Sequence, residues 1–81
     1  MDTRVAVIGI VVKNREECSR KVNDILSVYG HIIVGRMGIP YKDKGISVIS
    51  LIVDGTNDDI GAVTGKLGNI EGVKVKSVVT Y

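Results

Sequence analysis

Two segments of the chain are almost wholly aliphatic and β-branched, and they restrict the fold more than any other feature. They read RVAVIGIVV at residues 4–12 and ISVISLIV at residues 46–53, and the second ends at Asp54-Gly55. Neither shows the alternation of apolar and polar residues that is typical of a strand with one solvated face. Short uninterrupted apolar runs predict strands that are buried on both sides. We therefore expect both segments to be central strands of one sheet.

The segment after the first strand predicts a helix. Its apolar residues recur at helical spacing and form one stripe, which consists of Cys18, Val22, Ile25, Leu26 and Tyr29. Asn14 is the predicted N-cap, and Glu17 three residues later completes a capping box. Gly30 is predicted to end the helix in the left-handed conformation.

A hairpin is predicted next. Residues 31–39 form its first strand and residues 46–53 its second. The segment from Pro40 to Gly45 holds the residues that are typical of a turn.

The last third of the chain predicts a second helix and a fourth strand. Thr56 is a favourable N-cap, with Asp59 at the reciprocal position of a capping box. The apolar stripe of this helix consists of Ile60, Val63 and Leu67. Gly61 and Gly65 lie four residues apart, and we attribute them to close packing of the helix backbone. Residues 73–81 alternate in polarity and predict the last strand.

The resulting order, β-α-β-β-α-β, is typical of a ferredoxin-like α+β sandwich. We predict a single domain over residues 1–81, with a four-stranded antiparallel sheet in the order 4-1-3-2 and both helices on one face. This order places the two aliphatic strands in the centre. The edge strands then carry the proline and several lysines, which discourage unwanted strand pairing.

Two helices cover one face of such a sheet. No helix of the same chain packs on the other face. Whichever face meets the helices, the second face presents several large aliphatic side chains of the two central strands. Contiguous exposed apolar surface of this kind marks an interface. A short chain with one cysteine also has no intrachain disulfide to stabilise it. We therefore predict a homo-oligomer, a dimer or tetramer joined through the sheet face, the edge strands or both; the alternative is a monomer with an unusually apolar surface.

Composition and charge exclude several classes of protein. The formal net charge is +2 and the only aromatic residues are three tyrosines, so no basic stripe or stacking platform for nucleic acid is present. No run of about 18 apolar residues predicts a membrane helix, and no signal-peptide pattern is found, so we expect a cytoplasmic protein. One histidine and one cysteine are too few for a structural zinc site within one chain, and we expect no metal or cofactor.

The stretch HIIVGRMGIPYKDKG at residues 31–45 holds the candidate ligand-binding residues, which are His31, Gly35, Arg36, Gly38 and Tyr41. The planar guanidinium of Arg36 suits bidentate pairing with a carboxylate or phosphate, and its small neighbours leave it room. Glycines weaken a strand, so two of them indicate a bulge or a close backbone approach. The alternatives are a solvated arginine on an edge strand and a histidine with a structural role.

Three segments of the chain resemble one protein family. HIIVGRMGIPY, GISVISLIVDG and NIEGVKVKSVVTY resemble the iron-only hydrogenase system regulators, and the similarity extends over essentially the whole chain. The layout also resembles the ACT-like superfamily of small regulatory domains, which includes the C-terminal domain of nickel-responsive repressors. The resemblance implies a regulatory role without an established reaction. The loop after the first strand reads KNRE and lacks the glycine of amino-acid-binding ACT domains, which argues against amino-acid binding.

These observations predict a regulatory, ligand-sensing, oligomeric domain of an iron-only hydrogenase-associated system. The DNA-binding domain of the nickel-responsive repressors has no counterpart in the sequence, so we expect regulation through a partner protein. One alternative is a protein–protein interaction module that uses its edge strand and binds no small molecule. A small ferredoxin-like enzyme is a further alternative, although no nucleophile, base and orienting group come together in the sequence.

Overall fold

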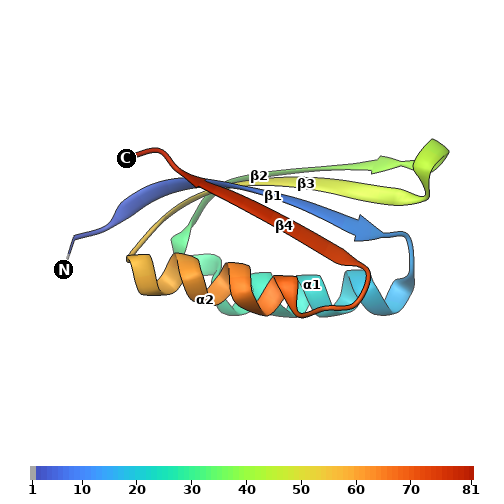
Figure 1. Ribbon diagram of the computed structural model, residues 1–81, viewed down its shortest axis with the longest axis horizontal. Coiled ribbons are helices and arrows are strands. Elements are labelled where there is room, and N and C mark those ends of the chain that lie inside the picture. The colour runs from blue at the N-terminus through green and yellow to red at the C-terminus, as the bar shows by residue number, and fades with distance from the viewer. Residues whose placement is uncertain (1) are drawn as a thin grey trace.

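The computed structural model describes residues 2–81, which form one four-stranded sheet with two helices against it. The elements are β1 (Arg4–Lys13), α1 (Glu16–Val28), the 3₁₀ turn η1 (Gly30–Ile32), β2 (Ile33–Tyr41), the 3₁₀ turn η2 (Lys42–Lys44), β3 (Ile46–Gly55), α2 (Asn57–Gly68) and β4 (Val73–Val79). The strand order is β2-β3-β1-β4, and every neighbouring pair is antiparallel. Both helices lie on the same side of the sheet (Figure 1). The predicted ferredoxin-like topology is confirmed.

The register decides which face of each central strand meets the helices, a choice that the sequence alone left open. Ile8 pairs with Leu51 and Ile10 with Ile49, and all four side chains are buried. The core on the helix side consists of Ala6, Ile8, Ile10, Val12, Cys18, Val22, Leu26, Ile32, Ile49, Leu51, Val53, Ile60, Val63, Leu67 and Val73. The predicted apolar stripes of both helices are therefore confirmed as core surfaces.

The predicted N-cap of the first helix is wrong, whereas its C-terminal end is confirmed except for the conformation of Gly30. Arg15, in an extended conformation, is the N-cap of α1 and makes no side-chain capping bond. Asn14 instead donates its backbone N–H to the carbonyl of Gly45, at 2.9 Å, so the β1–α1 loop is held against the β2–β3 hairpin. The helix ends at Tyr29, and Gly30 has no positive φ because the chain continues into η1.

The second strand starts and ends later than the sequence indicated. His31 and Ile32 belong to η1, whereas Pro40 and Tyr41 pair with β3. The turn itself is η2 followed by Gly45, whose φ of 64° is the left-handed conformation that glycine tolerates. At the other end of β3, the Asp54-Gly55 pair does not break the strand, because both residues pair with β1.

The capping box of the second helix is confirmed, while the explanation offered for its glycines is wrong. The Thr56 hydroxyl accepts from the backbone N–H of Asp59 at 3.1 Å, and the Asp59 carboxylate accepts from the Thr56 N–H at 3.2 Å. Gly61 and Gly65 are exposed, and a Cβ built at either position meets no atom within 4 Å. Close packing within the subunit therefore does not require them.

At Gly72, unlike at Gly61, the structure requires a glycine. Alanine substitutions at these two positions therefore form a matched test. The φ of Gly72 is 87°, and a Cβ there would lie 3.0 Å from the Cys18 Sγ. Gly72→Ala should lower the free energy of unfolding by about 1–2 kcal/mol or more because the backbone conformation is unfavourable for L residues. Gly61→Ala should raise it by about 0.5–1 kcal/mol through helix propensity. Urea denaturation of both variants measures these changes, and a stabilised Gly72→Ala would contradict the structure.

Candidate functional site

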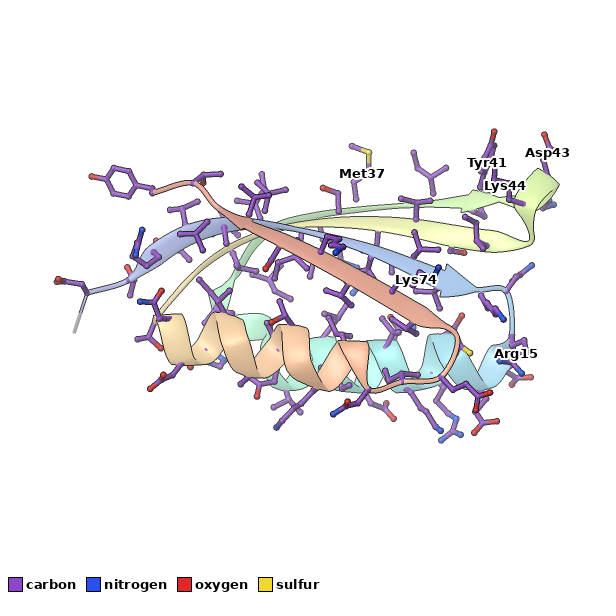
Figure 2. The ribbon with its side chains drawn as sticks, in the orientation of Figure 1. Arg15, Met37, Tyr41, Asp43, Lys44 and Lys74 are labelled. Atoms are coloured by element: carbon purple, nitrogen blue, oxygen red, sulfur yellow. The ribbon has the colours of Figure 1, made fainter. Side chains whose placement is uncertain are left out.

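The five candidate residues lie in three separate places. Arg36 and Gly38 pair with Leu51 and Ile49, which face the helices, so they lie on the helix side of β2. The remaining candidates lie elsewhere: Gly35 and Tyr41 are on the helix-free face and His31 is in η1. Figure 2 shows the Tyr41 side chain pointing away from the helices. No single site can therefore contain all five.

A cleft of about 190 Å³ lies on the helix side, between α1 and the edge strand β2. Its lining consists of Val12, Ser19, Val22, Asn23, Arg36, Gly38, Ile39, Pro40, Ser47 and Ile49. The cleft exists because the helix layer does not cover β2, whose residues from Arg36 to Tyr41 are all exposed. Gly38 leaves part of this space free because it has no side chain. A Cβ there would contact only the Ile49 Cγ1, at 3.7 Å.

Arg36 is held at the edge of this cleft by α1. Its Nη2 donates to the Oδ1 of Asn23 at 2.9 Å, an exposed bond that links β2 to the helix. A guanidinium has five N–H donors, so one bond to Asn23 leaves most of them for a ligand. The arrangement provides a positive, planar donor group next to an apolar floor that includes Val22 and Ile49.

The sequence prediction missed Asn23, the hydrogen-bond partner of Arg36, and the two serines that line the same cleft. Ser19 and Asn23 lie four residues apart, which places both on one face of α1, and Ser47 adds a hydroxyl from β3. The sequence did show that Ser19 and Asn23, each directly after a residue of the apolar stripe, recur at helical spacing. This spacing could not be read as a site without knowing which strand lies beside that face.

His31 takes part in a different surface cluster. Its ring stacks on Tyr29 with centroids 6.5 Å apart, and the Lys66 ammonium lies 5.4 Å from the centroid of the same tyrosine ring. These contacts join the end of α1 to α2. His31 therefore lies in a surface cluster apart from the cleft.

Metal and membrane sites find no support in the described chain. Among residues 2–81, no three His, Cys, Asp or Glu side chains lie close enough to hold a metal ion. Cys18 is buried, and its thiol donates to the carbonyl of Glu71 at 3.3 Å. Neither described helix is long and apolar enough to cross a membrane.

One carboxylate on α1 has a perturbed pKa, and it lies outside the cleft. The Lys21 ammonium, 3.0 Å from the Glu17 carboxylate, lowers the pKa of Glu17 through a hydrogen bond and its charge. Both side chains are exposed, as is common for pairs four residues apart on a helix. This ion pair is therefore a surface feature of α1 with no part in the site.

Comparison with protein families finds a match over most of the chain. Residues 4–77 match the TM1266-like family model, whose description reads "Iron-only hydrogenase system regulator, putative". No protein of curated function is significantly similar to the chain.

Solved structures share the fold. Uncharacterized protein TM1266 from Thermotoga maritima is 39% identical, with a TM-score of 0.97 over 99% of this chain and 100% of that one. The ACT domain from GTP pyrophosphokinase of Chlorobium tepidum is 20% identical, with a TM-score of 0.78 over 94% of this chain and 99% of that one. Its solution structure gives 19% identity and a TM-score of 0.77, over 100% of this chain and 92% of that one. The ACT likeness shows the fold alone.

Arg36 and Asn23, which lie at the rim of the cleft, are exposed, so they should contribute little to stability. We expect Arg36→Ala and Asn23→Ala each to change the free energy of unfolding by less than about 1 kcal/mol. Leu26→Ala, a buried position on the same helix, should cost about 2–5 kcal/mol and serves as the control. Urea denaturation compares the three variants. A loss above about 2 kcal/mol for Arg36→Ala would show that this arginine is structural.

Proposed function

Since the chain belongs to the TM1266-like family of iron-only hydrogenase system regulators, we propose that it is a non-catalytic regulatory domain that senses a small anionic ligand. The ligand binds in the cleft between α1 and β2, and binding is passed on to a partner protein of the hydrogenase-associated system. The cytoplasmic location predicted from the sequence belongs to the same proposal.

The observation that carries this proposal is the position of Arg36. Asn23 holds the guanidinium at the rim of a cleft whose floor is formed by core side chains such as Val22 and Ile49. Ligand sites commonly combine an apolar lining with a few placed polar groups that orient the ligand. An arginine fork in such a place favours a carboxylate or a phosphate. Ser19 and Ser47 add hydroxyls on the same lining.

The size of the cleft limits the ligand further. An enclosed apolar cavity of about 150 Å³ accommodates benzene. The cleft, with about 190 Å³, therefore has room for a body slightly larger than benzene with its charged group at Arg36. Short-chain and aromatic carboxylates, and small phosphate monoesters, satisfy both requirements.

A thermal-shift comparison tests the proposal, with benzoate, hexanoate, phenyl phosphate and inorganic phosphate as probes. A probe present at ten times its Kd should stabilise the protein by about 1.4 kcal/mol, which raises the Tm by about 6–11 °C in a chain of this size. Arg36→Ala should abolish the shift, and Arg36→Lys should weaken it because the fork is lost.

Two further variants serve as controls. Arg20→Ala removes an exposed arginine of α1 that does not line the cleft, and it should leave the shift unchanged. Gly38→Val should fill the cleft with little strain, since a Cβ fits there, and should abolish the shift without loss of fold. A Tm shift that survives in Arg36→Ala would contradict ligand sensing. So would the absence of a Tm shift with every probe at about 10 mM.

A second candidate function rests on the free edge of β2. Within residues 2–81, β2 pairs only with β3, so its outer backbone groups are open to a strand from another protein. Addition of a strand to a free edge is a common mode of peptide recognition. This interaction module without a small-molecule ligand becomes the favoured function if no probe binds.

A further inference from the structure

The helix-free face of the sheet carries ordered rows of side chains across the strands. The register places Gly35, Ile52, Val7 and Val78 in one row, Met37, Ser50, Gly9 and Lys76 in the next, and Ile39, Val48, Val11 and Lys74 in the third. Figure 2 shows Met37 projecting from this face, away from the helices. We call these three rows the open face. Its outer rows are mainly aliphatic.

The middle row of the open face forms a trough at its centre. Gly9 of β1 lies opposite Ser50 of β3, so the two central strands carry almost no side chain there. On either side, Val7 and Ile52 form one aliphatic ridge and Val11 and Val48 form the other. The face is therefore a pair of ridges with a trough between them.

Nothing within the subunit requires a glycine at position 9. A Cβ there would approach only the backbone oxygen of Lys76, at 4.0 Å, and φ is not positive. Glycine in the interior of a strand weakens it, and often marks a place where another backbone or a ligand comes close. In the subunit alone the space above Gly9 is empty, so the glycine leaves room there for a group from outside the chain.

The chain exposes more surface than an average monomer of its mass. The chain exposes 5361 Å², whereas a monomer of 8.7 kDa has about 4,700 Å². The four strands have 9, 10, 10 and 7 residues in sheet order, which gives a face of about 590 Å² from a rise of about 3.4 Å and a spacing of about 4.8 Å. Two such faces bury about 1,200 Å² together, above the roughly 1,000 Å² that a specific interface needs.

We propose that the open face is the docking surface for a second copy of this chain, with an aliphatic ridge of each copy packed into the Gly9–Ser50 trough of the other. In this arrangement a two-fold axis runs parallel to the rows, between a ridge and the trough. It places one ridge of each copy in the trough of the other, as the self-complementary interface of a symmetric dimer requires. The charged residues Lys74 and Lys76 lie on the edge strand β4, so they form a polar rim on that side of an apolar centre. The proposal is independent of the ligand in the α1–β2 cleft.

Size-exclusion chromatography with light scattering tests the proposal on the full chain. The unaltered protein should have twice the 8.7 kDa mass of one chain. Gly9→Val should fill the trough, and we expect it to weaken dimerisation by about 100-fold or more because the extra methyl groups overpack the interface. Its amide NMR spectrum should stay dispersed, since the side chain has room in the subunit.

A second variant and a control complete the experiment. Val48→Lys places a charge on one ridge and should also give the single-chain mass. Val28→Lys alters an exposed valine of α1, away from the open face, and should leave the dimer intact. A tetramer that both open-face variants reduce to dimers would support the same interface. A single-chain mass for the unaltered protein, or a dimer that persists in both folded open-face variants, would overturn the proposal.

Discussion

The structure depends on one constraint: β1 and β3 are apolar on both faces, and the chain has helices for only one. The helix side is closed by the packing of Ile8, Leu51 and their neighbours against α1 and α2. On the opposite side Val7, Val48 and Ile52 remain 39–45% exposed. Because more than half of each side chain is already buried within the subunit, completing the burial of six such side chains adds about 4–8 kcal/mol, a large fraction of the stability of a small domain. The proposed second subunit on the open face would satisfy this constraint.

The same limited helix layer explains where the candidate ligand site lies. The helices cover the central strands, and β2 extends beyond them as an exposed edge (Figure 1). Where α1 runs beside that edge, core side chains form a floor and Arg36 reaches Asn23 across the gap. The cleft and the open face are on opposite sides of the sheet. A ligand in the first therefore need not compete with a subunit on the second.

The sequence predicted the fold because its strongest signals are redundant. Two aliphatic strands, two amphipathic stripes and the Thr56 capping box all favour the same topology. The start of α1 and the ends of β2 were misplaced because Asn14 bonds to Gly45 and η1 precedes β2, and both depend on tertiary contacts. The cleft was predictable only in part. Arg36 and Gly38 are recognisable in the sequence, whereas Asn23 becomes a partner only when α1 is placed beside β2.

The central claim is that the helix-free face is buried by another copy of the chain. Isotope-filtered NOE spectroscopy on a mixture of labelled and unlabelled protein measures this contact directly. The account predicts intermolecular contacts between the methyl groups of one ridge, either Val7 and Ile52 or Val11 and Val48, and the Gly9–Ser50 region of the other copy. Intermolecular contacts confined to β2 or the helices, or none at all, would contradict it.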